Sequence, residues 1–294
     1  MRRTALLVQA SLTVSLVFVT YSVVKNHFDA KPSTVRRSNI VTIGTGVKGG
    51  DTRRIVRKTC SSNHSYVDFG TSLTQQQLER VDQCIINFIN DGNEGLRHAK
   101  ADRNIRYRSH TYLNNNSFII EAGGHRGVDV SEFNERFHPG VYVVLEPVLE
   151  FYEILKEKFK DSPNIVVHNF GVDVKSSTFL VNQGNDGISI YKKQKGTVKL
   201  QVIAVSEFLQ KLKISESRKV DLLTLNCEGC EYAFLDYLIS TDYINLFRNI
   251  QFQSHRAPDI CHPVKRYCWY QELLSETHKI VFQHKFWWES WMQK

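Results

Sequence analysis

Short apolar strands alternate with amphipathic segments over the second half of the chain, and this alternation constrains the fold more than any other feature. Five strands are predicted, at residues 117–122, 141–146, 164–169, 220–226 and 249–253. A helix is predicted at 128–138, and further helices follow the second and fourth strands. Strands that alternate with helices form a parallel sheet with helices on both faces. We therefore expect an α/β fold.

Three further segments complete the expected organisation. Residues 176–205 predict a β-hairpin, and the closing sequence HKIVFQHKFWWESW predicts two terminal strands. Upstream, residues 74–90 predict a helix, because Thr74 and Gln77 form a capping box ahead of an apolar stripe. The stripe consists of Leu78, Val81, Ile85, Phe88 and Ile89.

The N-terminus has the pattern of a membrane segment. No charged residue occurs between Thr4 and Val24, whereas Arg2 and Arg3 precede this run and Lys25 follows it. A spanning helix needs about 20 apolar residues. The run is longer than the core of a typical signal peptide, and no clear cleavage site follows it. We expect an uncleaved signal anchor at 1–24, with a cleaved signal peptide as the alternative.

A basic linker is predicted at 25–62. Its charge bears on whether the protein binds nucleic acid and on which side of the membrane the domain lies. The formal net charge of +8 is concentrated in the first 60 residues, so the remaining chain is nearly neutral and nucleic acid is not an expected partner. The basic residues that follow the apolar run outnumber Arg2 and Arg3 before it, so the positive-inside rule alone would leave the domain in the cytosol. Two glycosylation sequons, at 63–65 and 115–117, favour the lumen instead.

Six cysteines are present, and an even number suits an oxidising compartment. We expect a luminal domain in the ER or Golgi, or a secreted one if the N-terminal segment is cleaved. Zinc is not expected, because the spacing of Cys261 and Cys268 is wrong for a zinc ribbon. A bond between these two cysteines is the preferred pairing, with Cys60–Cys84 also considered. Cys227 and Cys230 are left open as free or paired.

In sheets of this kind, ligands bind beyond the carboxyl ends of the strands. The first strand ends at Glu121 and runs into a turn with glycines at 123, 124 and 127, which lets the backbone approach a ligand closely. The second strand ends at Glu146, whose carboxylate can accept both hydroxyls of a ribose. The third ends at Asn169, whose amide can bind an adenine edge or simply form a turn.

The fourth and fifth strand ends carry the candidate chemistry. Asn226, Glu228 and Glu231 follow a strand that is expected to be buried, where polar side chains have no structural need. His255 follows the fifth strand and can act as a general base near neutral pH. Trp287 and Trp288 are candidates for core packing or for a stacking wall beneath a sugar.

Taken in order, these strand ends resemble the FkbM family of S-adenosylmethionine-dependent methyltransferases. The resemblance covers about residues 117–294. The matching stretches are Glu121–Gly127, Glu146–Pro147, VIAVSEFL at 202–209 and Asp221–Glu231. It implies a class I methyltransferase fold, Rossmann-like, with a seven-stranded sheet whose last strand is antiparallel. Members commonly methylate hydroxyls of sugars or polyketide-like metabolites.

The resemblance also implies roles for the strand ends. Residues 121–127 would flank the methionine part of the cofactor, Glu146 would hold the ribose, and Asn169 would lie near the adenine. Two departures stand out, because Thr224 replaces the usual Lys of the fourth-strand motif and Asn226 replaces its Asp. A membrane anchor is not general in the family either.

The expected organisation is therefore a membrane segment, a linker, a helical extension at 63–116 and a methyltransferase domain at 117–294. The expected function is O-methylation of a glycan, lipid-linked or small-metabolite acceptor, with Asn226 added to the cofactor contacts and Glu228 or His255 as the base. The alternative is an anchored interaction protein that has lost turnover. A glycosyltransferase is disfavoured, because no D-x-D metal motif is present.

Overall fold

The computed structural model of the chain describes residues 56–60, 64–182, 188–192 and 196–294. The predicted membrane segment and most of the predicted linker lie outside these residues. Within the described ranges, no helix is long and apolar enough to cross a membrane.

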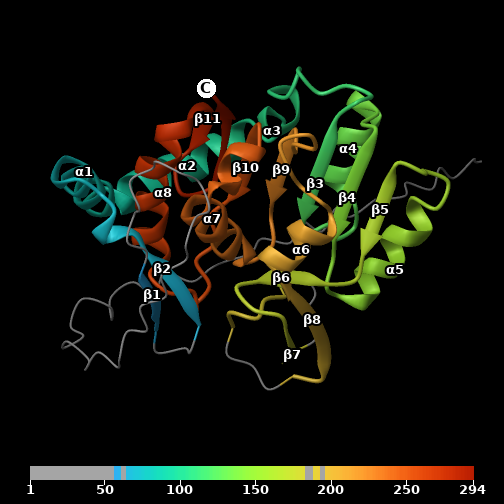
Figure 1. Cartoon of the computed structure of the whole chain (residues 1–294), viewed down its shortest axis with the longest axis horizontal. Coiled ribbons are helices and arrows are strands. Elements are labelled where there is room, and N and C mark those ends of the chain that lie inside the picture. The colour runs from blue at the N-terminus through green and yellow to red at the C-terminus, as the bar shows by residue number, and fades with distance from the viewer. Residues whose placement is uncertain (1–55, 61–63, 183–187, 193–195) are drawn as a thin grey trace, which may run out of the picture. The chain divides into compact units, whose positions relative to one another are not determined.

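A seven-stranded mixed sheet forms the centre of the fold (Figure 1). Across the sheet, its strands are β11 (His278–His284), β12 (Trp288–Gln293), β10 (Asn249–Gln253), β9 (Leu222–Leu225), β3 (Phe118–Ala122), β4 (Val141–Leu145) and β5 (Ile165–His168). The strands from β10 to β5 are parallel, whereas β12 is antiparallel to both of its neighbours. This Rossmann-like arrangement confirms the predicted α/β methyltransferase fold, including the terminal strand pair.

Helices cover both faces of the sheet because successive strand residues point to opposite sides. In β3, Ile119 packs on one face with apolar residues of α4 (Val128–Phe137) and α5 (Leu149–Lys158). Ile120 packs on the other face, where α6 (Val205–Lys211), α7 (Cys230–Ser240) and α8 (Pro263–Thr277) contribute the core.

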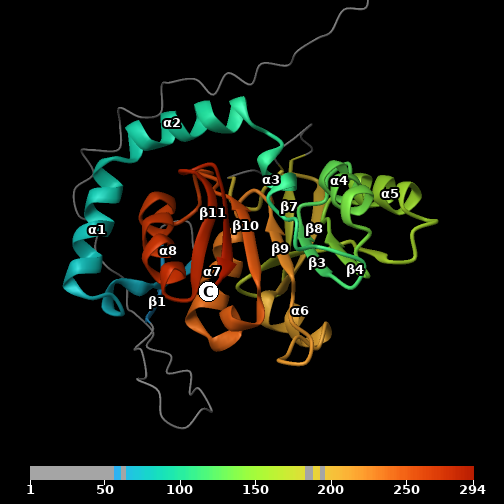
Figure 2. The same ribbon diagram turned by 90° about the horizontal axis from the view of Figure 1, so that it is seen from above.

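The helical extension differs from the single predicted helix. The capping box is confirmed, since Thr74 and Gln77 exchange hydrogen bonds at the start of α1 (Gln75–Ile86). That helix ends at Asn87, and α2 (Phe88–Ala101) begins directly after it, followed by α3 (Ile105–Arg108). Because the break changes the direction of the chain, Ile89 is exposed rather than part of one buried stripe. Figure 2 shows α1 beside α8 and α2 beside the edge strand β11.

Two smaller sheets flank this centre. The predicted hairpin is confirmed as the antiparallel pair β7 (Ser177–Val181) and β8 (Val198–Ala204), with β6 (Gly171–Asp173) added along β8. A second sheet pairs β1 (Val56–Thr59) with β2 (Ser65–Asp68), so the last part of the predicted linker forms a strand.

The described residues form three disulfides, two of which connect distant parts of the chain and correct the predicted pairing. Cys60 is bonded to Cys261, Cys84 to Cys268, and Cys227 to Cys230. The predicted Cys261–Cys268 bond is wrong because Cys268 lies within α8, which packs against α1 and meets Cys84 there. Cys261 precedes that helix and meets the residue after β1, so Cys60–Cys84 is wrong as well.

Candidate active site

A cavity of about 320 Å³ opens beyond the carboxyl ends of β3, β4 and β9. Its other walls come from α5, β8, residues 188–191 and the turn that leads into α7. The size falls within the usual range for small-molecule sites. Its position is the one where ligands bind in open α/β sheets.

Glu146 is the central polar residue of this cavity. It is 4% exposed, and its carboxylate accepts backbone hydrogen bonds from His125 at 2.7 Å and from Val148 at 2.8 Å. These bonds fix the side chain while leaving further lone pairs on both oxygens. Burial raises the pKa of Glu146 to about 7, although the two backbone bonds oppose this shift.

That pKa predicts a pH-dependent affinity for a ribose ligand. The carboxylate is the form that accepts from ribose hydroxyls, and the neutral acid dominates below pH 7. We expect the affinity for 5′-methylthioadenosine, which has the ribose but no amino acid, to rise about tenfold between pH 6 and pH 8. Calorimetric titrations measure it. Glu146→Gln should remove the pH dependence, and a parent affinity that is constant over this range would contradict the assignment.

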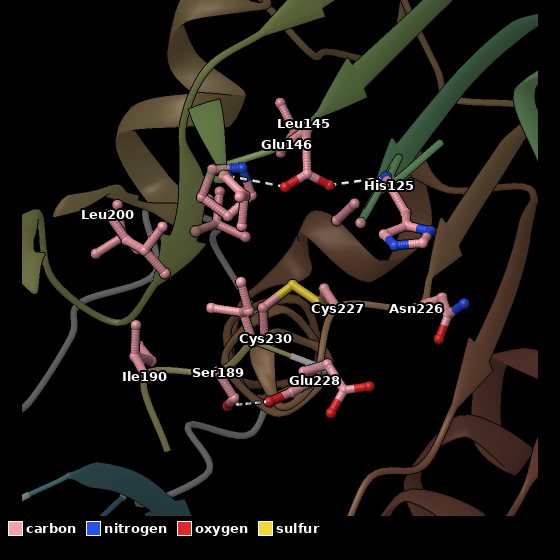
Figure 3. Close-up of a pocket in the computed structure, with 18 of the residues that line it drawn as sticks. His125, Leu145, Glu146, Ser189, Ile190, Leu200, Asn226, Cys227, Glu228 and Cys230 are labelled. Carbon is pink, nitrogen blue, oxygen red and sulfur yellow. Dashed lines mark hydrogen bonds between the residues drawn. A yellow bond between two sulfur atoms is a disulfide. The ribbon is translucent and has the colours of Figure 1, made fainter. Parts of the chain in front are cut away.

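The two sides of Glu146 differ in chemistry. Figure 3 shows Leu200 and Ile190 on one side of its carboxylate and His125 and Asn226 on the other. Val148, Phe151 and Ile188 also line the cavity and pack in one apolar cluster with Leu200 and Ile190. A flat heteroaromatic ring fits an apolar slot, and a polar tail fits the opposite end.

Among the predicted turn glycines, only Gly123 lines the cavity. Its φ is +95°, and an added Cβ would lie 2.0 Å from the backbone oxygen of Asn226. The end of β3 therefore closes directly on the end of β9. Gly124 and Gly127 serve packing instead, because a Cβ at either position would strike Leu155 of α5.

Glu121 does not reach the cavity, which corrects its expected place. It lies on the opposite face of β3, where its carboxylate accepts a short hydrogen bond from the Tyr142 hydroxyl. Alternation along the strand explains this, because Ala122 faces the cavity and its neighbour must face α4. Burial raises the pKa of Glu121 well above its usual value, helped by the nearby charge of Asp129.

Asn169 also lies outside the set of residues that line the cavity. Its side-chain amide donates to the backbone oxygen of Glu146 at 3.0 Å. It therefore supports the loop that holds Glu146, in place of the predicted contact with an adenine. Asn226 does line the cavity, as predicted.

His255 is held between two carboxylates. Its Nδ1 lies 3.0 Å from Oε1 of Glu231, which is 1% exposed, and its Nε2 lies 3.4 Å from Glu228. Burial alone would lower the pKa of His255, but the two carboxylates outweigh it and raise the pKa to about 10. His255 thus keeps its proton at neutral pH. His255 is also absent from the cavity lining, so the structure favours a positioning role for it over the predicted general base.

Glu228 is the predicted catalytic residue that the structure places at the cavity. Burial opposes its ionisation, yet His255 and Lys192 lower the pKa of Glu228 below its usual value. The carboxylate is therefore charged at neutral pH. Its backbone has a φ of +56°, between the bonded Cys227 and Cys230, which hold this turn at the start of α7.

Residues 188–191 form a wall that sequence patterns did not indicate. Tyr191 is buried and donates to Asp173 at 2.8 Å, while the Ser189 hydroxyl donates to the backbone oxygen of Glu228 at 2.6 Å. Their segment belongs to the predicted hairpin, whose composition carries no ligand-binding motif. Only the tertiary fold brings it over the cavity.

Comparisons with known proteins give likeness of structure only. No family model and no curated protein matches the chain. An O-methyltransferase from Bacillus cereus in complex with SAH shares 10% identity at a TM-score of 0.36, over 75% of this chain and 92% of that one. Aeropyrum pernix fibrillarin with bound S-adenosyl-L-methionine shares 12% identity at a TM-score of 0.35, over 62% and 67%. Values this low carry no argument about function.

Proposed function

We propose that this chain is an S-adenosylmethionine-dependent O-methyltransferase. The observation that carries the proposal is the cavity around Glu146. A buried, oriented carboxylate lies between an apolar slot and the Gly123 turn, beyond the strand ends of a methyltransferase-type sheet. These three parts suit the ribose, the adenine and the methionine portion of the cofactor respectively.

Membership of the FkbM family is part of the proposal, and the structure bears on one departure from its motif. Thr224 is 1% exposed and lies on the face of the sheet opposite the cavity, beside Glu121. Its hydroxyl accepts from Gln251 at 3.3 Å, which in turn contacts His110 at 2.9 Å. A lysine at position 224 would therefore lie in a buried polar network. Its replacement by Thr removes no side chain from the cavity.

The chemistry needs little from the protein beyond positioning. The cofactor supplies a methyl group on a sulfonium, a good leaving group, so orientation accounts for most of the rate. With the cofactor bound, the acceptor oxygen would form the new bond to the methyl carbon as the carbon–sulfur bond breaks, and the neutral thioether would leave. In this proposal Glu228, whose pKa is lowered, accepts the proton that the acceptor hydroxyl loses.

The alternative is an interaction protein without turnover, and Asn226 in place of Asp is the observation that favours it. A transfer assay separates the two. The full chain, purified with its disulfides intact, is incubated with methyl-labelled cofactor and a glycan and lipid extract. We expect label in an ether product and less of it with Glu146→Ala. Cofactor binding without any transfer would support the alternative.

We also propose that the domain lies in the lumen of the secretory pathway, anchored by the N-terminal segment. Three disulfides join residues up to 201 positions apart, which requires an oxidising compartment in most cells. Asn115 of the second sequon is exposed, so a glycan there would not disturb the core.

A glycosidase experiment tests this location. We expect the protein made in eukaryotic cells to move faster on a gel after endoglycosidase treatment. Asn115→Gln should remove the part of the shift that this site contributes, with Asn116→Gln as the matched control. A protein that shows no shift, and whose C-terminus is cut by protease added to the cytosolic side, would contradict the luminal location.

A further inference from the structure

A second cavity, of about 270 Å³, lies beside the cofactor cavity. Asn226 lines both of them, so the two meet at the end of β9. The lining of the second cavity includes Asn226 and Gln253 at the ends of β9 and β10, and residues of the segment 99–106, which runs from the end of α2 to the start of α3. A ligand seated here would face the polar end of the cofactor cavity, where the methyl group is expected.

Two aromatic side chains form a wall of this cavity. Trp287 and Trp288 both line it, and each is only partly buried. Trp287 donates to the backbone oxygen of Gly92 at 2.8 Å, and the guanidinium of Arg106 lies 4.7 Å from the ring of Trp288. These contacts fix both indoles. Fixed, partly open indoles suit the flat face of a sugar ring.

Four charged side chains line the cavity, and two of them are neutralised by ion pairs. Arg106 is paired with Asp129 through two bonds of 2.7 and 2.9 Å, and Asp102 is paired with Arg108. Lys100 and Arg103 also line the cavity, are exposed, and form no ion pair among the described residues. The described lining therefore offers two unpaired cations and no unpaired carboxylate.

A buried histidine among the lining residues has two ring nitrogens without a hydrogen-bond partner among the described residues. His284 lines the cavity at 9% exposure, and neither of its ring nitrogens has a hydrogen-bond partner among the described residues. Burial lowers the pKa of His284, so the ring is neutral at pH 7 and offers one donor and one acceptor.

We propose that this second cavity is the acceptor site and that it takes an acidic sugar, a pyranose that bears a carboxylate, sulfate or phosphate. The ring would stack on the tryptophans and the anion would pair with Lys100 and Arg103. A ring hydroxyl would reach Asn226, at the boundary with the cofactor cavity. The proposal rests on the methyltransferase function for its role, but its binding can be measured without cofactor.

Tryptophan fluorescence provides that measurement. The chain has four tryptophans, and the two outside this cavity, Trp269 and Trp291, are fully buried, so quenching reports mainly on the site. The full chain is titrated with glucuronic acid, N-acetylglucosamine 6-sulfate, glucose 6-phosphate and glucose. We expect at least one acidic sugar to bind about tenfold more tightly than glucose, and the preferred one identifies the anion. No acidic sugar binding up to about 50 mM would overturn the proposal.

A charge reversal separates the site from general attraction of anions. Arg103→Glu should weaken the preferred acidic sugar at least tenfold and leave glucose binding unchanged. The matched control is Arg97→Glu, an exposed cation of α2 outside this cavity. Equal losses in both variants would overturn the proposal. Binding of S-adenosylhomocysteine, measured separately by calorimetry, tests the methyltransferase function, so the failure of one is distinguishable from the failure of the other.

Discussion

His255→Ala is expected to lower the free energy of unfolding by about 3 kcal/mol. The imidazolium is the positive partner of Glu231, which is 1% exposed, and its removal leaves a buried carboxylate without a counter-charge. Two backbone N–H groups, from Gly229 and residue 255, still donate to that carboxylate, which keeps the loss at the lower end for buried pairs. Urea denaturation with the disulfides intact measures it.

A double variant identifies the cause of this loss. Glu231→Gln removes the orphaned charge, so the pair His255→Ala with Glu231→Gln should recover about half of the lost stability. If His255→Ala unfolds at the same urea concentration as the parent, the imidazolium does not stabilise Glu231 and the raised pKa of His255 has been assigned wrongly.

Glu228→Gln is expected to lower turnover on the order of 10²-fold, the low end for the loss of a general base. The change keeps the shape of the side chain at the cavity and removes only its charge. Since Glu146 and the Gly123 turn account for cofactor binding, the affinity for S-adenosylhomocysteine should stay within about tenfold of the parent. Labelled methyl transfer and calorimetry measure the two quantities.

Glu216→Gln is the matched control for this variant, because Glu216 is an exposed glutamate outside both cavities. It should leave transfer and binding at parental levels. Parental turnover in Glu228→Gln would show that no carboxylate base is needed and that positioning alone suffices.

The fold could be predicted from the sequence because its signals are local. Strand and helix alternation from Phe118 onward depends on the period of apolar residues, which survives in any parallel sheet. The N-terminal helices were harder to predict. The helix α1 ends at Asn87, where no neighbouring proline or glycine marks the break. The apolar pattern therefore continues through Ile89, which is exposed in the structure.

The site could be predicted only in part. Strand ends converge in any such sheet, which places Glu146, Asn226 and Glu228 at the cavity. The face on which a side chain near the end of a strand lies depends on which strand residue reaches the cavity, and that residue is Ala122 rather than its neighbour Glu121. The state of His255 depends on contacts with residues 24 and 27 positions away, which local patterns do not encode.

The pairing of the cysteines could not be predicted for a similar reason. Sequence proximity favours short loops, whereas Cys84 and Cys268 are 184 residues apart and meet because two helices pack together. Connectivity follows the tertiary fold rather than the spacing.

A crystal structure of the chain with S-adenosylhomocysteine tests the central claim most directly. We expect both ribose hydroxyls within about 3.2 Å of the Glu146 carboxylate. The adenine should lie against Leu200 and Phe151, and the sulfur should lie near Gly123 and Asn226. Ligand density elsewhere, or an empty cavity in crystals soaked at millimolar concentration, would contradict the claim that this is a methyltransferase cofactor site.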